Sequence, residues 1–203
     1  MADETPGTNG ATPTATAPSQ VRRLDSPEAA VLAGQAAVFE DLQYVLRCCE
    51  HLVSVLGSAD PDPVLVEALW TAALTGYVRC FSGRAGVLSD ADLGELELDG
   101  DVDEFHTMVK KLRDHYASRH VNPREAFTIG AAQANDGKPT GVAVVSTPRP
   151  LVDDVTVRLL GRIAYALSGL LDARMQDSQA QVLAAAGELS PVELGRLPLV
   201  HLS

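Results

Sequence analysis

The sequence predicts a mainly α-helical fold, a four-helix bundle with a β-hairpin inserted between the third and fourth helices. Apolar residues recur at intervals of three and four over four long segments, and prolines or capping residues precede these segments. One stretch, residues 124–146, changes instead to the alternating pattern of strands. Because an amphipathic helix cannot bury its apolar stripe alone, four such helices are expected to pack on one another.

The composition fits one domain with a tail. The 203-residue chain is 46% hydrophobic and 21% charged, which suffices for an apolar core. Residues 1–24 are rich in Thr, Ala and Pro and contain little to bury, so they are predicted to be disordered. We expect the helical bundle domain over residues 25–187, with its hairpin at 124–146, and a short C-terminal helix and tail over 188–203.

The first helix is predicted to begin at Ser26 and Pro27, which suit an N-cap and a first helical position, and to end at Gly57. One face of this segment is apolar, which identifies the side expected to face the core. That stripe comprises Val31, Ala37, Val38, Leu42, Val45, Leu46, Cys49 and Val53.

The second helix is predicted from about Pro63 to Phe81. Its aromatic residues Trp70, Tyr77 and Phe81 recur at helical spacing and are interpreted as core. A base-stacking platform beside a phosphate site is the alternative, and Arg84, just after the helix, would then contact the substrate.

The remaining elements follow from local signals. Residues 88–100 are acidic and are interpreted as a solvated loop. A third helix is expected from about residue 101 to the residue before Asn122 and Pro123, because the proline ring disfavours helical geometry at Asn122. A fourth helix follows Pro150 and reaches about Ala186, and a capping-box pattern at residues 190–193 predicts a short last helix.

Charge and motifs exclude several classes of protein. With 16 basic and 27 acidic residues the formal net charge is −11, so any contact with nucleic acid must use a local basic site. Cys48, Cys49 and Cys80 lack the spacing of a zinc site and are interpreted as buried thiols in a reducing cytosol. No dinucleotide, serine hydrolase or zincin motif occurs, and no apolar run could span a membrane. We therefore expect a cytoplasmic protein with no cofactor, no metal and no membrane partner.

The third helix concentrates the residues able to carry chemistry. His106, Arg113 and His120 are spaced seven residues apart, which places them within roughly 20° of one helical face, with Lys110 beside them. Arginine holds phosphate by paired hydrogen bonds, and histidine exchanges a proton near neutral pH. Asp114 could orient one of these groups. Metal-independent cleavage of RNA needs these functions, whereas a solvated basic helix face is the alternative.

The segment from Arg113 to His120 resembles the arginine, polar residue, short gap, histidine signature of HEPN domains, which are helical nucleotide-binding and ribonuclease bundles of toxins and phage-defence systems. The flanking FHTMVKKLRDHY and VNPRE segments, and LWTAALTGYVRCFSGR on the second helix, are similar to uncharacterised bacterial proteins with that signature. This chain has Arg119 where the commoner spacing has the histidine.

The resemblance implies a HEPN-like, metal-independent endoribonuclease or an RNA-binding relative. Arg113 would bind phosphate, His120 would act as general base or acid, and Asp114 would orient them. The resemblance also implies a homodimer with a composite site, RNA as substrate, and a protein partner or antitoxin. The alternative is a non-catalytic helical module for dimerisation or protein interaction. The further residues expected to contact substrate are His106, Lys110, His115, Arg119 and Arg84.

Overall fold

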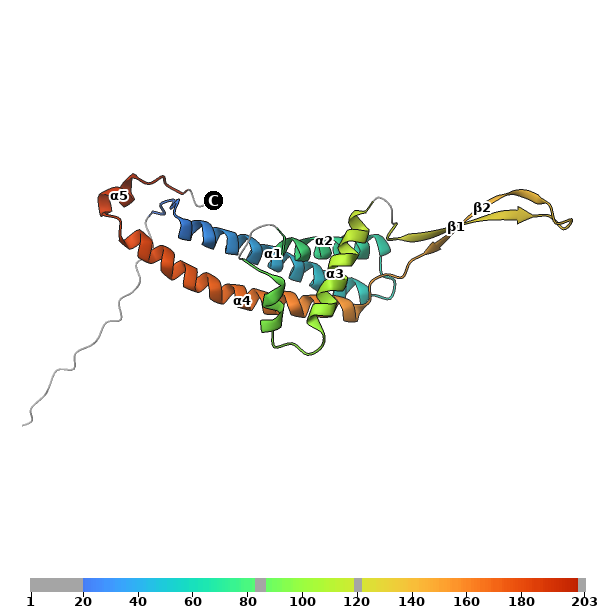
Figure 1. The fold of residues 1–203 in the computed structure, drawn as a ribbon, viewed down its shortest axis with the longest axis horizontal. Helices are drawn as coiled ribbons and strands as arrows, with labels where there is room; N and C mark the ends of the chain where they lie inside the picture. The colour runs from blue at the N-terminus through green and yellow to red at the C-terminus, as the bar shows by residue number, and fades with distance from the viewer. Residues whose placement is uncertain (1–19, 83–86, 119–121, 201–203) are drawn as a thin grey trace, which may run out of the picture.

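The computed structural model describes residues 20–82, 87–118 and 122–200. Over these ranges the protein is mainly helical, with one antiparallel β-hairpin between the third and fourth α-helices, as the sequence predicts (Figure 1). The elements are α1 (Pro27–Leu56), α2 (Pro63–Cys80), the 3-10 helix η1 (Asp90–Glu95), α3 (Val102–Ala117), β1 (Glu125–Gln133), β2 (Pro139–Pro148), α4 (Asp154–Gly187) and α5 (Pro191–Arg196).

The core forms where α1 packs against both α4 and α2. The third helix, α3, lies against α2 and η1 and crosses the direction of the long helices (Figure 1). All three predicted aromatic core positions of α2 belong to this core, since Trp70 and Tyr77 are buried and Phe81 packs against them. The largest completely buried side chains are Tyr77, Leu42, Leu52, Leu74, Leu160, Ile163, Leu167 and Leu171.

Side-chain caps explain why the helices begin where the sequence indicates. The Ser26 hydroxyl accepts a hydrogen bond from the Ala29 backbone N–H at 3.2 Å, and the carboxylates of Asp62, Asp101 and Asp153 cap α2, α3 and α4 in the same way. Ser190 and its partner three residues on form the predicted capping box of α5. These local bonds satisfy N–H groups that a helix start otherwise leaves unpaired.

The apolar stripes extend further along the helices than the packing does. Val31 belongs to the predicted stripe of α1, yet it is 53% exposed, and Val155 near the start of α4 is 75% exposed. Periodicity identifies the face of a helix that can be buried, but the neighbouring helices decide over what length that face is covered. No described helix is both long enough and apolar enough to cross a membrane.

The hairpin begins one residue later and ends two residues later than the predicted 124–146, and it extends away from the helices (Figure 1). Every residue of both strands is exposed except Glu125, at the base. Phe127 lies opposite Ser146, Ile129 opposite Val144, and Ala131 opposite Val142, so these residues share one face of the hairpin. The other face carries Thr128 opposite Val145 and Gly130 opposite Ala143.

Residues 1–19 of the predicted tail lie outside the described residues. The end of that segment runs beside the C-terminal segment, where the backbone N–H of Arg23 donates to the Pro198 carbonyl and that of Val200 donates to the Val21 carbonyl, both at 2.9 Å. The predicted tail therefore ends in backbone contacts next to the start of α1.

Close approach of α1 and α2 requires Gly76. A Cβ built at this position would lie 3.0 Å from Val45, a fully buried residue of α1, whereas a Cβ at Gly169 in α4 would meet nothing within 4 Å. We expect Gly76→Leu to lower the free energy of unfolding by about 1–3 kcal/mol through overpacking. Gly169→Ala should raise it by roughly 0.5–1 kcal/mol because alanine favours the helix. Urea denaturation followed by circular dichroism measures both, and equal stability of the two variants would contradict the packing described here.

Candidate functional site

The described site residues that the sequence predicts on α3 lie in different environments. His106 is buried, Lys110 and Arg113 are partly exposed, and Asp114 and His115 are exposed. The other three predicted residues, Arg84, Arg119 and His120, lie outside the described residues. The third helix also ends earlier than predicted, at Ala117, where the backbone of Ser118 becomes extended, so regular helical spacing does not continue from Arg113 to position 120. The convergence of Arg113 and His120 on a common anion therefore stays a prediction.

Both ring nitrogens of His106 are occupied within the protein. Its side chain is 3% exposed, with Nδ1 2.9 Å from the Tyr77 hydroxyl and Nε2 3.2 Å from Oδ1 of Asp90. An ionised carboxylate can only accept, so Nε2 carries the proton that is donated to Asp90, and Nδ1 accepts from the Tyr77 hydroxyl. The Phe81 ring, with its centroid 4.5 Å from that of the imidazole, covers the remaining side.

Electrostatics favour this neutral form of His106. Burial lowers the pKa of the imidazole, although the charge of Asp90 acts in the opposite direction. Lys110 Nζ lies 3.1 Å from Oδ2 of Asp90, and this hydrogen bond lowers the pKa of that carboxyl. The chain of contacts from Tyr77 to Lys110 thus joins α2, α3 and η1. His106 and Lys110, both predicted to bind substrate, instead contact Asp90.

Arg113 and His115 face different sides of α3. The Arg113 Nε lies 3.0 Å from Oδ1 of Asp114, so a neighbouring carboxylate offsets part of its charge. Residues two apart on a helix are separated by about 200°, and His115 lines a cavity with residues of other elements. Asp114 thus lies beside Arg113, and its predicted role in orienting a catalytic group stays a prediction.

The acidic segment is more than a solvated loop. Asp92 is 7% exposed and forms an ion pair with Arg174 of α4, whose other guanidinium nitrogen donates to the Val87 carbonyl at 3.0 Å. Burial alone would raise the pKa of Asp92, but hydrogen bonds from Arg174 and Ser89 bring it below its ordinary value. The spacing of Ser89 and Asp92 is that of a capping box and could have revealed η1, whereas nothing local indicates the partner on α4.

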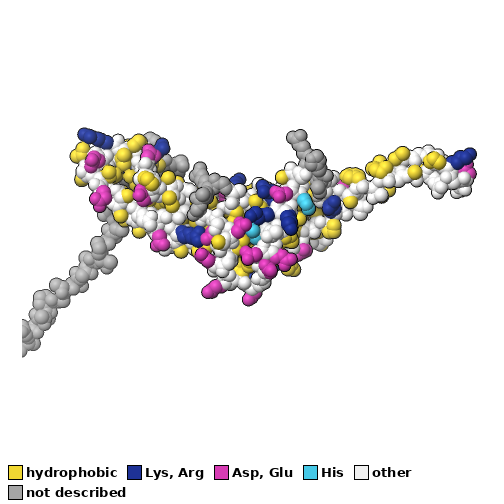
Figure 2. Space-filling view, viewed as in Figure 1, with side chains coloured by type: hydrophobic (Ala, Val, Ile, Leu, Met, Phe, Trp, Pro, Cys, Tyr) yellow, Lys and Arg dark blue, Asp and Glu magenta, His cyan; other side chains and the backbone are white. Residues whose placement is uncertain are grey.

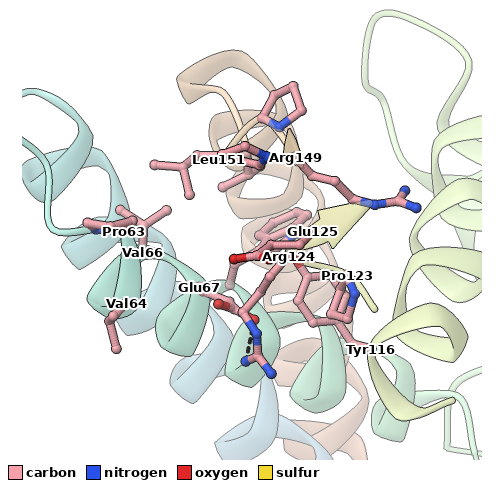
Figure 3. A pocket seen from close by; sticks show the side chains of 14 residues that line it. Pro63, Val64, Val66, Glu67, Tyr116, Pro123, Arg124, Glu125, Arg149 and Leu151 are labelled. Atoms are coloured by element: carbon pink, nitrogen blue, oxygen red, sulfur yellow. Dashed lines mark hydrogen bonds and ion pairs between the residues drawn. The ribbon is translucent and has the colours of Figure 1, made fainter. Parts of the chain in front are cut away.

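A cavity of about 300 Å³ lies at the base of the hairpin (Figure 3). Trp70 is its floor, being 3% exposed, and Tyr116, at the end of α3, forms part of its wall. Burial, reinforced by the negative charge of Glu67, raises the pKa of the Tyr116 hydroxyl. The cavity is lined by Pro63, Val64, Val66, Glu67, Trp70, Tyr116, Pro123, Arg124, Glu125, Pro148, Arg149, Pro150, Leu151 and Val152.

Sequence reasoning missed this cavity because its lining comes from α2, the end of α3, both strands and the linker to α4. A second hollow of about 340 Å³ shares Trp70, Tyr116 and Arg149 with the first and includes His115. The available signal was the set of prolines that bracket the strands, which rigidify the chain at Pro123, Pro148 and Pro150.

The cysteines are packing residues. Cys48, Cys49 and Cys80 are buried and reduced, as the sequence predicts. Burial raises the pKa of Cys49 and of Cys80 to about 12, so these thiols stay protonated. Within the described ranges, no three His, Cys, Asp or Glu side chains come together as metal ligands.

Burial of His106 predicts a pH-dependent stability. The unfolded chain takes up a proton at this imidazole near pH 6.5, whereas the folded protein resists protonation, so acidification favours unfolding. We expect the free energy of unfolding to fall as the pH drops from 7 to 5, and to fall less steeply in His106→Gln, which will also be less stable at pH 7. Urea titrations at each pH measure the free energy of unfolding. His51→Gln, a change at an exposed histidine, is the control and should show the same dependence on pH as the parent.

No protein-family model, curated protein or solved structure matches this chain. Three features of the molecule therefore bear on its function: the cationic groups of α3, the cavity at the base of the hairpin, and the hairpin itself.

Proposed function

We propose that this protein is a helical interaction module that forms a homodimer through the apolar face of its hairpin. The observation that carries the proposal is the exposure of four apolar side chains on that face. Phe127 is 56% exposed, Ile129 64%, Val142 76% and Val144 65%. Exposed apolar patches of this kind mark interaction sites in proteins.

A hairpin of this composition is an unfavourable structure when it remains uncovered in water. Two-stranded hairpins are only marginally stable without a further layer, and an uncovered strand edge invites pairing. Natural edges are protected by charges, whereas β1 carries no charged residue after Glu125 and β2 carries none at all. A partner that covers the hairpin would offset both costs.

Charge favours a second copy of this chain as that partner. Each copy carries a formal net charge of −11, so two copies repel each other over most of their surfaces. The hairpin between its charged ends is an uncharged surface, where this repulsion is smallest. A two-fold axis brings the same face of both copies together, and an apolar face is complementary to itself.

The dimer proposal distinguishes the two faces of the hairpin. Ile129→Asp places a charge on the apolar face and should weaken self-association at least tenfold, because the carboxylate would be buried without a partner. Thr128→Asp places the same charge on the opposite face and should leave the dimer intact. Sedimentation velocity at micromolar concentrations measures both variants beside the parent.

Two results would contradict this proposal. A parent protein that remains monomeric at 50-fold higher concentration than the assay has no such interface. Equal dissociation by the two aspartate variants would show that association does not depend on the apolar face. Circular dichroism of each variant confirms that the helices remain folded.

HEPN-like RNA cleavage is a second candidate function. Here α1 to α4 would form the four-helix bundle of such a domain, Arg113 would bind phosphate, and His120 would exchange the proton. The supporting observation is the gathering of lysine, arginine and histidine side chains over α3, within acidic surroundings (Figure 2). The partly exposed Arg113 and the exposed His115 belong to this group of side chains. As the resemblance implies, such an enzyme would be a toxin or phage-defence component, and an antitoxin could be its partner. The reduced cysteines favour the cytoplasm as its location.

RNA cleavage predicts a specific product. The parent, incubated with total RNA in EDTA, should produce 2′,3′-cyclic phosphate ends, and Arg113→Ala or His120→Ala should reduce the rate about 100-fold or more, since each removes a group needed in the transition state. Arg196→Ala, an exposed change in α5, is the matched control and should keep the parental rate. Negligible cleavage by the parent, equal to that of the variants, would exclude the enzyme.

A further inference from the structure

We propose that the cavity at the base of the hairpin binds a small aromatic anion, with its ring against Trp70 and Tyr116 and its anionic group on the guanidinium of Arg149. This site is separate from the apolar face proposed for dimerisation. It does not depend on either proposed function.

The walls of the cavity are preformed and suit a flat ring. Four prolines line it, and their fixed backbone dihedral angle leaves little freedom to lose when a ligand binds. Trp70 and Tyr116 add aromatic surface. A volume of about 300 Å³ is at the lower end of the range for ligand sites, so the cavity suits one or two fused rings with a single substituent better than a dinucleotide.

The carboxylates around the cavity already have partners. Glu67 Oε1 lies 3.0 Å from the Arg124 guanidinium, which is the pair shown by the dashed line in Figure 3. The Ser146 hydroxyl donates to Glu125, and Asp153, which lines the second hollow, accepts from the Thr156 backbone N–H at 2.8 Å as the cap of α4.

Arg149 is the second arginine of the lining, and no carboxylate of the described residues pairs with it. Its backbone N–H donates to the Arg124 carbonyl at 2.7 Å, which holds its Cα at the edge of the cavity. Its guanidinium forms no ion pair or hydrogen bond with any residue in the described part of the chain. Arg149 lines both hollows, whereas His115 lines only the second.

A guanidinium beside an apolar, ring-lined hollow selects a molecule that combines an aromatic ring with a carboxylate or phosphate. The planar guanidinium donates two parallel hydrogen bonds to either group. An aryl carboxylate and a nucleoside monophosphate share this chemistry, and titration with one compound of each kind separates them.

Trp70 makes the test specific, because it is the single tryptophan of the chain and lies in the cavity floor. Its fluorescence is titrated with 2-naphthoate and, separately, with AMP. We expect a saturable change with at least one of these anions and at least tenfold weaker binding of its uncharged counterpart, 2-naphthamide or adenosine. The anion that saturates identifies the source as an aryl carboxylate or a nucleotide.

Arg149→Gln provides the decisive comparison, since the side chain is exposed and its loss leaves the fold intact. It should weaken binding of the anion at least tenfold and leave binding of the uncharged counterpart unchanged. Arg196→Gln, at the opposite end of the molecule (Figure 1), should bind like the parent. Absence of a saturable change with both anions, or equal affinity of Arg149→Gln and the parent, would overturn the proposal. Neither result affects the sedimentation or RNA-cleavage experiments, so the ligand site is tested independently of the proposed functions.

Discussion

The contact of α1 with α2 and α4 is the interaction on which the rest of the structure depends. Leu42, Val45 and Leu52 on α1 are completely buried between the two neighbouring helices. Burial of such side chains contributes roughly 1.5–3 kcal/mol each, more than any single polar contact on the surface. This apolar contact gives α3 and the hairpin a rigid support, although neither contributes as much to the core.

Polar contacts then position the segments that the apolar core leaves free. The hydrogen bonds of His106 and the ion pair of Asp92 attach η1 to α2, α3 and α4. In the sequence, a histidine such as His106 and a carboxylate such as Asp92 look like parts of a ligand site. Where a buried polar group has a satisfied partner, its first role is structural, and the partly exposed Arg113 and the exposed His115 are the better candidates for contact with other molecules.

The hairpin and the cavity at its base form the part of the molecule most suited to recognition. Its strands expose apolar side chains to water at a distance from the helices. This exposure does not stabilise a folded monomer. At its base, prolines and two rings line a hollow next to Arg149, whose guanidinium has no partner among the residues that the structure describes. One end of the protein thus carries both features proposed for binding, the apolar face of the hairpin and the cavity at its base, while the helices provide the scaffold.

The sequence by itself determined about where the helices begin, where α1 and α2 end, the existence of the hairpin and most of the buried stripe, because capping, proline geometry and periodicity act within a few residues. It did not determine the end of α3, which lies at Ala117 and not just before Asn122. It also predicted that Cys48, Cys49 and Cys80 are buried. Only the tertiary structure decided that His106 binds Asp90, that Asp92 binds Arg174, and that both faces of the hairpin are exposed. These outcomes depend on side chains far apart in the chain, and no local pattern records which of them will meet.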